Sequence, residues 1–492
     1  MNNLYKKLVL LGGLLGFLGA VHAMEKEPLE GSMKGLPLDA QRQIALSMIG
    51  DFLLNQQKPK TLEHDDAVYA TDISPDSKHI VTASFDSTAK KWYRDGNLEC
   101  IFKSHKGLIN LIAISTDNAY VATGSFDKGA EEIDRTVKIW DMHTCQLLHT
   151  LGEKEITRHL TSITALAISP DNSYIVTGSA DHTIKVWDIK TGQLLFSFGG
   201  LTPNTPGWTD NWINDIQISA DSTYVTIATN NGEVILLHAR NGRFIPVSRH
   251  INKIISMALA GDKLVTGSWD GTVKLSSANT GQMIHIFGNR TNKVLSVDIS
   301  HDGAFVVAGP ADAESVAKVW NANTGQLLHI LGGAQGHKDL IKKVKISSDN
   351  KYVATASEDN TVKAWSLATG ALLYTFIGHT KKIESLKISP DVRYLVSGSW
   401  DHTAKIWTLM LNLNAEEFNT QGSPLAWIKN EISIFQANLI ARAYAATRAG
   451  KALVIKSVID FDLLNATDDM YIWLTMPKYV RDYLVDHLNI EF

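Results

Sequence analysis

Hydrophobic and polar residues alternate in short runs along most of the chain. Residues 136–140 (TVKIW), 183–187 (TIKVW) and 403–407 (TAKIW) carry apolar side chains at every second position. This two-residue period is typical of strands with one buried face. Each run follows a second apolar run that ends in a Ser and an Asp, as in YIVTGSAD. Each copy therefore predicts two strands joined by a tight turn that contains an aspartate.

The pattern returns at intervals of about 44 residues, which indicates a repeat architecture. A turn such as TGQLL (191–195 and 324–328) or TGQMI (280–284) leads into a further apolar run. Another strand in each unit ends in Ile-Ser-Pro-Asp or a relative of that sequence. Each unit thus predicts four short strands, and eight units fit between about residue 57 and residue 411.

Three residue types keep a fixed spacing within the units. A histidine lies 22 residues before the turn aspartate in five units, and a tryptophan lies six residues after it in four. With Gly-His at 336–337 and 378–379 and Trp-Asp at 140–141 and 187–188, the sequence resembles the WD-repeat β-propeller family. The resemblance implies an all-β, eight-bladed β-propeller over residues 57–411, with seven blades as the alternative.

The resemblance also implies a hydrogen-bonded set of His, Ser or Thr, Asp and Trp inside each blade. A buried aspartate must be paired, and imidazole, hydroxyl and indole N–H groups are suitable donors. By position, the sets are His64, Ser84, Asp86 and Trp92; His105, Ser125, Asp127 and Trp140; His159, Ser179, Asp181 and Trp187; His337, Ser357, Asp359 and Trp365; and His379, Ser399, Asp401 and Trp407. In the second set, Trp140 is displaced by an insertion at residues 128–134.

Units four, five and six depart from this pattern. Unit five keeps His250 and Asp270 at a spacing two residues shorter and has Ser276 where tryptophan is expected. Unit four has Asn231 and Leu237 in place of the aspartate and tryptophan, and unit six has Arg290 in place of the histidine but keeps Trp320. These blades are expected to be the less stable part of the ring.

The last unit ends on its third strand, near Trp407. Residues 59–62 (PKTL), just before the first histidine, occupy the position of a fourth strand. An N-terminal strand that completes the last blade would leave no open sheet edge. We therefore expect the two ends of the repeat region to close the ring together.

The N-terminus has the pattern of a secretory signal peptide. Lys6 and Lys7 precede a 14-residue apolar run from Leu8 to Val21, followed by small residues up to Ala23. Residues 1–23 are therefore predicted to be cleaved, and the mature chain is expected in the periplasm or outside the cell. Only two cysteines are present, too few for the dense disulfide framework of a small secreted domain, and neither lies at the cleavage point.

The flanks are predicted to be helical. Residues 24–56 contain apolar residues at helical spacing after Leu36-Pro37, an opening similar to the start of an F-box, although a simple packing helix is favoured. Residues 412–492 predict a C-terminal helical region. The 47 basic and 51 acidic residues give a net charge of −4, which provides no overall attraction to nucleic acid.

Propellers of the resembled family bind partners on the top face, through the residue before the turn aspartate and positions near the start of each innermost strand. Aromatic residues and lysines are enriched at these positions and are the predicted partner-binding residues. They are Tyr69, Phe85, Phe126, Trp212, Trp269, Trp400, Lys253, Lys293, Lys342 and Lys382. Trp400, Tyr69, Phe85 and Phe126 are expected to form one aromatic sector across neighbouring units.

A Ser near a His and an Asp also resembles a nucleophilic triad, but its repetition in five units favours a structural role. The four carboxylates of residues 127–134 favour a solvated loop over a calcium site. We therefore predict a non-enzymatic protein-binding scaffold, an exported effector or an envelope component, with no catalytic residue, metal or cofactor. The alternative is a periplasmic propeller that binds or hydrolyses glycans or peptides.

Overall fold

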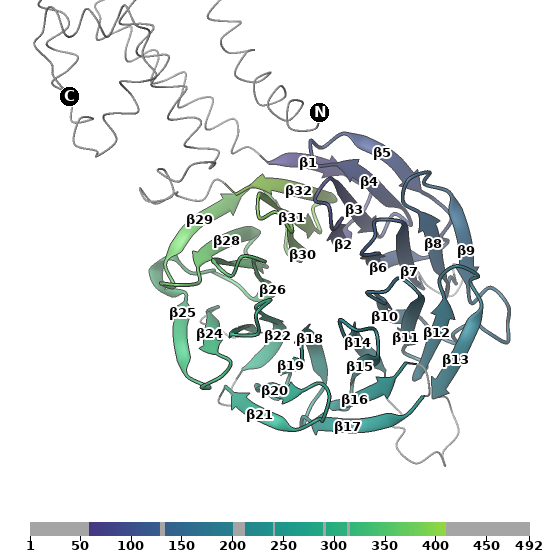
Figure 1. Ribbon diagram of the computed structural model, residues 1–492. Helices are drawn as coiled ribbons and strands as arrows, with labels where there is room; N and C mark the ends of the chain where they lie inside the picture. Colours follow the sequence, from purple (N-terminus) through teal and green to yellow (C-terminus); the bar gives the residue numbers. More distant parts are fainter. Residues whose placement is uncertain are drawn as a thin grey trace, which may run out of the picture. The chain divides into compact units, whose positions relative to one another are not determined.

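The computed structural model describes residues 59–127, 133–199, 212–239, 242–288, 292–311 and 315–409. These residues form eight separate four-stranded antiparallel sheets, which follow one another around a central axis like the blades of a propeller (Figure 1). The described residues therefore form an all-β, eight-bladed β-propeller, as predicted, and the seven-bladed alternative is excluded. One short 3-10 helix, Gly333–Gln335, lies between two blades.

In blades 1 to 7 the chain runs from the innermost strand to the outermost, and in blade 8 it runs from the innermost strand to the third. Blades 1 to 4 contain β2 (Val68–Ile73), β3 (His79–Ser84), β4 (Ala89–Tyr93) and β5 (Leu98–Phe102); β6 (Leu108–Ile114), β7 (Tyr120–Phe126), β8 (Val137–Asp141) and β9 (Leu147–Leu151); β10 (Ile163–Ile168), β11 (Tyr174–Ser179), β12 (Thr183–Asp188) and β13 (Leu194–Gly199); and β14 (Ile213–Ile218), β15 (Tyr224–Thr229), β16 (Glu233–His238) and β17 (Phe244–Arg249). Blades 5 to 8 contain β18 (Ile254–Ala260), β19 (Lys263–Ser268), β20 (Val273–Ser277) and β21 (Met283–Phe287); β22 (Lys293–Ile299), β23 (Phe305–Ala311), β24 (Ala317–Asn321) and β25 (Leu327–Leu331); β26 (Ile341–Ile346), β27 (Tyr352–Ser357), β28 (Thr361–Ser366) and β29 (Leu372–Ile377); and β30 (Ile383–Ile388), β31 (Tyr394–Ser399), β32 (Thr403–Thr408) and β1 (Lys60–Glu63).

Blade 8 is completed by the N-terminal strand. β1 pairs antiparallel with β32, so that Lys60 faces Ile406 and Glu63 faces Thr403. The first and last strands of the ring therefore share one sheet, and the predicted closure is correct. Leu62 of β1 is fully buried between blades 8 and 1. Because a single sheet contains both ends of the repeat region, opening the ring requires the loss of this strand pairing.

The hydrophobic core lies between neighbouring blades. The alternating apolar residues of one blade pack against those of the next, so each junction has a cluster of its own. At the junction of blades 1 and 2, for example, Val81, Phe102, Ile109 and Trp140 are all at most 3% exposed. Burial of each such side chain contributes about 1.5 to 3 kcal/mol. No blade can bury its faces alone, so the stability of the ring depends on every junction.

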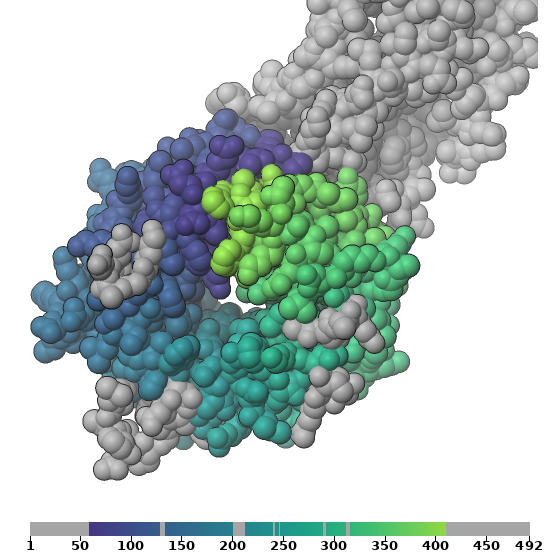
Figure 2. Space-filling model, turned by 180° about the vertical axis from the view of Figure 1, so that it is seen from behind, coloured from purple at the N-terminus to yellow at the C-terminus, as the bar shows by residue number. Residues whose placement is uncertain are grey.

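Each innermost strand has one edge without a strand partner. Side chains of the preceding blade form hydrogen bonds with some of the backbone N–H groups on that edge. Asp72, Asp215 and Asp298 accept hydrogen bonds from the backbone N–H groups of the next inner strand at 3.1, 2.7 and 2.8 Å. Lys387 and Lys345 pair with the carboxylates of Asp72 and Asp298 at 3.0 and 3.1 Å. The centre of the ring is open (Figure 2). These charged side chains therefore both connect the blades and neutralise one another.

A disulfide joins Cys100 of β5 to Cys145, in the turn between β8 and β9. It takes the place of a contact that recurs at other junctions. Cys100 occupies the register position of His149 in the next blade, and the ring of His149 packs on Gly192. Cys145 has a φ of 60° and stands where Gly192 has a φ of 68°. The disulfide therefore links blades 1 and 2 where a histidine on a glycine links blades 2 and 3.

Several predicted segments lie outside the described residues. They are the signal peptide at 1–23, the helical flanks at 24–56 and 412–492, Arg290, and residues 128–132 of the insertion. Within the ranges given above, the chain has no helix long and apolar enough to cross a membrane.

Candidate protein-binding face

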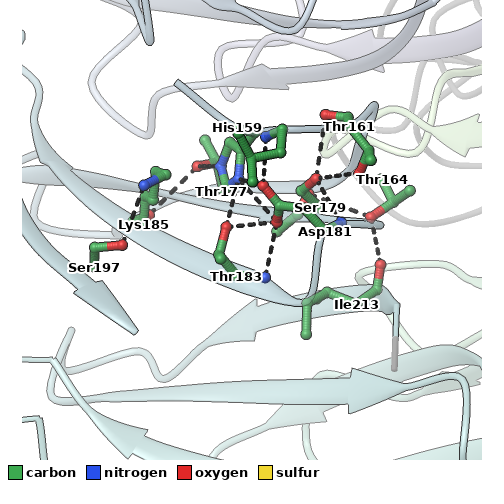
Figure 3. Close-up of polar contacts among 12 residues, drawn as sticks. His159, Thr161, Thr164, Thr177, Ser179, Asp181, Thr183, Lys185, Ser197 and Ile213 are labelled. Carbon is green, nitrogen blue, oxygen red and sulfur yellow. Dashed lines mark hydrogen bonds and ion pairs between the residues drawn. The ribbon is translucent and has the colours of Figure 1, made fainter. Parts of the chain in front are cut away.

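Each intact blade contains a buried polar network that fixes the turn before its third strand. In blade 3, the Nδ1 atom of His159 lies 3.3 Å from the carboxylate of Asp181, and its Nε2 atom lies 2.8 Å from the hydroxyl of Thr177 (Figure 3). The indole N–H of Trp187 donates to the same hydroxyl at 3.0 Å. Thr183 donates its backbone N–H and hydroxyl to Asp181. The network thus ties β11, β12 and the turn between them to the segment that precedes β10.

The hydroxyl that joins the histidine to the tryptophan is not the predicted serine. In blade 1, Thr82 Oγ1 contacts both His64 and Trp92, whereas Ser84 accepts the backbone N–H of Asp86 at 3.0 Å. Both residues are on the same face of one strand, but the serine is nearer the turn and stabilises its backbone. The same correction applies to the predicted Ser125, Ser179, Ser357 and Ser399, for which the linking residues are Thr123, Thr177, Thr355 and Ser397.

The carboxylate of blade 2 also differs from the prediction. His105 lies 2.8 Å from Asp134, at the end of the insertion, and not beside Asp127. Asp127 instead pairs with Arg135 at 2.9 Å. The displaced turn leaves the hydroxyl of Ser125 buried with no hydrogen-bond partner among the described residues. The insertion therefore precedes the turn aspartate, which keeps Asp134 six residues before Trp140.

The network of blade 3 contains a neutral histidine beside a charged aspartate. Burial lowers the pKa of His159 more than the nearby Asp181 raises it. Burial alone would raise the pKa of Asp181, but hydrogen bonds from His159, Thr183 and the backbone N–H of Leu160 hold it well below its usual range. With a neutral imidazole, both nitrogens of His159 have a hydrogen-bond partner, because Nδ1–H donates to the carboxylate of Asp181 and Nε2 accepts from the hydroxyl of Thr177. These buried groups present no exposed nucleophile, so they support the structure of the ring.

The departing blades are altered to different degrees. Blade 5 retains His250 beside Asp270 at 3.1 Å and Thr266 at 2.8 Å, because its two missing residues shorten the β18–β19 turn at the other end of the strands. Blade 4 replaces the network with Ile227 and Leu237, both fully buried. Blade 6 has a small cavity beside Trp320, lined in part by Ala308, which stands at the position of the linking threonine.

On the top face, where the inner strands begin, three predicted aromatic residues form a continuous run. The rings of Tyr69 and Phe85 stack with centroids 5.1 Å apart, and Phe85 meets Trp400 edge to face at 6.0 Å. The run crosses the junction between blades 8 and 1, and Tyr69 is 36% exposed. We call these three residues the aromatic run. Phe126, 42% exposed, belongs to the predicted sector but makes no ring contact with the run among the described residues.

A charged cluster borders the aromatic run. The indole N–H of Trp400 donates to Glu384 at 3.1 Å, and Lys382 stacks on the ring at 4.1 Å. Lys342 lies 3.4 Å from Glu358 and 3.5 Å from Glu384. Burial, and then the charge of Glu384, raise the pKa of Tyr69. Glu384 was missed by the sequence analysis, although a glutamate at a strand position occupied by apolar or polar neutral residues in most other blades is a detectable signal.

The other predicted face residues lie apart from the aromatic run. Trp212 is 53% exposed at the start of blade 4. Trp269 of blade 5 is half-buried beneath two lysines, with Lys253 Nζ at 3.3 Å and Lys293 Nζ at 4.1 Å from the ring centroid. The described residues contain no group of three His, Cys, Asp or Glu side chains that could hold a metal ion. The top face therefore offers two separate aromatic surfaces with lysines beside them.

Comparison with known proteins agrees with this architecture. The profile of the family described as WD domain, G-beta repeat matches residues 56–93, 96–141, 147–188, 281–321, 325–366 and 370–408, which together cover half of the chain. The chain belongs to this family. The profile leaves residues 189–280 unmatched, a stretch that contains all of blade 4 and most of blade 5. Those are two of the three blades whose networks depart from the repeat.

Relatives of this chain include proteins of different overall length. Over 379 residues it is 25% identical to a guanine nucleotide-binding protein subunit beta of Oryza sativa subsp. japonica, with coverage of 73% of this chain and 84% of that protein. It is 26% identical over 160 residues to the human apoptotic protease-activating factor 1, which covers 32% of this chain but only 12% of the human protein. The computationally designed Ika8 protein is structurally similar, with a TM-score of 0.59, 29% identity, and coverage of 71% and 98%.

Proposed function

We propose that this chain is a non-enzymatic scaffold that binds a partner protein through the top face of its propeller. WD-repeat propellers generally act as protein-interaction scaffolds. The observation that carries the proposal is the aromatic run, in which Tyr69, Phe85 and Trp400 present one apolar strip across two blades. Aromatic side chains in a cluster with a charged border are the composition of interface hot spots. The contribution of such a ring to binding is about 2 kcal/mol or more.

The polar chemistry of the ring supports a scaffold over an enzyme. The His, Thr or Ser, Asp and Trp network recurs in five blades, with its histidines at most 7% exposed. A catalytic triad requires one accessible nucleophile at one site, whereas these hydroxyls are buried against a tryptophan in every copy.

We further propose that the protein works outside the cytoplasm, as an exported effector or as a component of an envelope complex. Two independent features support this location: the signal-peptide pattern of residues 1–23 and the disulfide between Cys100 and Cys145. Disulfides persist mainly in oxidising compartments. Peptide mapping of the protein from cell fractions tests the proposal. We expect a new N-terminus near residue 24 and oxidised cysteines in the periplasmic or secreted fraction, and reduced cysteines in the cytoplasm would contradict it.

Affinity capture tests the scaffold proposal. The extracts are those of the cell envelope and, for the exported-effector proposal, of host cells. A Tyr69→Ala/Phe85→Ala/Trp400→Ala variant, shown by circular dichroism to be folded, is compared with the unchanged chain and with Tyr93→Ala, which removes an exposed aromatic ring at the end of β4, away from the top face. We expect one partner protein to be captured by the unchanged chain and by Tyr93→Ala, but not by the triple variant. Equal capture by all three proteins would refute the role of the aromatic run. If no protein is captured and the chain binds glycans on a carbohydrate array, the glycan-binding alternative is favoured.

A further inference from the structure

The four lysines of the top face fall into two pairs with different surroundings. Lys342 and Lys382 lie 3.5 and 3.4 Å from the carboxylate of Glu384. Lys253 and Lys293 make no ion pair within 4.0 Å with any carboxylate of the described ranges, and both ammonium groups lie against Trp269 instead. Among the described residues, the second pair therefore holds two positive charges at one ring without a negative partner.

Blades 5 and 8 contain the same arrangement of lysine and tryptophan. The backbone N–H of Trp269 donates to the carbonyl of Lys253 at 2.9 Å, and that of Trp400 donates to the carbonyl of Lys382 at 3.0 Å. In both blades the ammonium group stacks on the indole of its partner. Both lysines immediately precede the inner strand of their blade. Lys253 with Trp269 and Lys382 with Trp400 therefore occupy equivalent positions in their blades and make the same two contacts.

The carboxylate is the part that differs between the two blades. In blade 8 the second residue of the inner strand is Glu384, which accepts the indole N–H of Trp400 and pairs with Lys382. In blade 5 the same position is Ile255. The indole nitrogen of Trp269 is accordingly buried with no hydrogen-bond partner among the described residues. Blade 5 therefore has the cation and the ring of this arrangement but lacks its acid.

The absence of an acid at this position has an electrostatic consequence. Burial, and then the positive charge of Lys293, lower the pKa of Lys253. The cation–π contact of each ammonium group with Trp269 is attractive and offsets part of the repulsion between the two lysines. A carboxylate from another molecule would reduce the repulsion between the two ammonium groups, as Glu384 does by pairing with both Lys342 and Lys382.

We propose that Lys253, Trp269 and Lys293 form a binding site for a carboxylate side chain in an acidic linear segment of the partner protein. The proposal rests on the proposed function, because it assumes that the top face receives a protein, and it adds the chemistry that the partner must carry. The occupant is a carboxylate because the group at the equivalent place in blade 8 is a glutamate. Together with the aromatic run, the site gives the top face one apolar and one cationic contact region.

A fluorescein-labelled peptide of six glutamates, measured by fluorescence anisotropy with the full chain, tests this inference. We expect binding that a peptide of six glutamines does not show. Ile255→Glu places in blade 5 the acid found in blade 8, and it should weaken binding at least tenfold. Lys253→Gln/Lys293→Gln should do the same. Lys78→Gln is the matched control, because it makes the same change in charge as Ile255→Glu but lies in the β2–β3 turn, at the other end of the inner strands.

Three results would overturn the inference: no binding of the glutamate peptide, equal weakening by Lys78→Gln, or tighter binding of a phosphoserine peptide of the same length. Circular dichroism of each variant shows whether its ring is folded, and Ile255→Gln separates the added charge from the change of shape. Tyr69→Ala/Phe85→Ala/Trp400→Ala should keep its affinity for the peptide within twofold. The unchanged chain could fail to bind the glutamate peptide while its capture of a partner protein still depends on the aromatic run. That result would reject this carboxylate site but not the proposed scaffold function.

Discussion

Single hydroxyl groups decide how firmly each blade is held. The hydroxyl of Thr177 receives the indole N–H of Trp187 and contacts His159, so its removal leaves two buried polar groups unpaired. An unpaired buried group costs about 1 to 3 kcal/mol. The hydroxyl of Thr266 in blade 5 contacts only His250 in this way, because Ser276 replaces the tryptophan.

We therefore predict that Thr177→Val lowers the free energy of unfolding by about 3 kcal/mol and Thr266→Val by roughly half as much. Valine keeps the shape of the side chain, so the difference reports the hydrogen bonds. Urea unfolding followed by circular dichroism measures both changes. Equal losses in the two variants would show that the tryptophan adds nothing to the network.

The buried histidines also predict how stability depends on pH. Burial lowers the pKa of His250 to about 4, so the folded chain does not take up the proton that the unfolded chain binds near pH 6.5. The free energy of unfolding should therefore fall as the pH decreases from about 6.5 to 4, by about 3 kcal/mol for this residue. Urea unfolding at pH 7.5, 6 and 4.5 tests this, with His250→Gln expected to reduce the dependence and the exposed His143→Gln expected to leave it unchanged.

The aspartates add to acid sensitivity at lower pH. Their folded pKa values are lowered, since hydrogen bonds from histidine and threonine overcome the effect of burial. The stabilisation they contribute is present above about pH 4 and is lost as the pH falls below it. In blade 2 this role belongs to Asp134. Asp134→Asn should therefore cost about 2 kcal/mol or more, and Asp127→Asn less than about 1 kcal/mol, since its ion pair with Arg135 is partly exposed.

At the scale of elements, the repeat phrase predicted the strands and their order but not every contact between them. The phrase VTGSAD contains a threonine and a serine two residues apart, and a two-residue period places both on one face of the strand. Sequence alone therefore could not tell which one joins His159 to Trp187. The position of Asp134 was predictable, because it keeps the six-residue spacing to Trp140 that the other units show.

The disulfide was predictable only from an alignment of the outer strands and turns. Cys100 aligns with His149, and Cys145 aligns with the turn glycines that adopt positive φ. A cysteine in this left-handed conformation is strained relative to glycine by about 1 kcal/mol. The cross-link therefore compensates a local cost at the junction of blades 1 and 2.

We predict that Cys100→Ser/Cys145→Ser lowers the free energy of unfolding by up to about 4 kcal/mol, the loop-entropy value for this separation. Cys100→His/Cys145→Gly should lose about 1 kcal/mol less, because glycine relieves the strained turn and the histidine restores the contact seen at Gly192. Thermal unfolding of the two variants under non-reducing conditions compares them. Greater stability of the serine variant would contradict this account of the junction.

At the scale of the whole molecule, the ring depends on its closure. β1 supplies the outer strand of blade 8, and its Leu62 is fully buried. Removal of residues 1–63 would expose the edge of β32. It would also remove Leu62 from the hydrophobic cluster that contains Trp92 and Ile406. We expect such a chain to aggregate, or to unfold at a midpoint about 10 °C or more below that of a chain that lacks only residues 1–58. Differential scanning fluorimetry with size-exclusion chromatography distinguishes the two results.

The sequence predicted which residues of the top face lie close together at some positions, but not the contacts that they make. Phe85 and Trp400, which precede turn aspartates, lie close together, and Phe85 also contacts Tyr69 near the start of β2. Lys342 and Lys382 both pair with Glu384, whereas Lys253 and Lys293 have no carboxylate partner among the described residues, and Ile255 occupies the position of Glu384 in blade 5. Sequence reasoning treated the four lysines as one set, since contacts between adjacent blades depend on the three-dimensional ring.

Site-specific photo-crosslinking tests the central claim, that a partner protein binds the top face. A photoreactive phenylalanine analogue is placed at position 69, next to Phe85, and in a second protein at position 78, in the β2–β3 turn at the other end of the inner strands. We expect one protein to be crosslinked at position 69 and none at position 78 in the same extract. Crosslinking of that protein only at position 78, or equally at both, would contradict it.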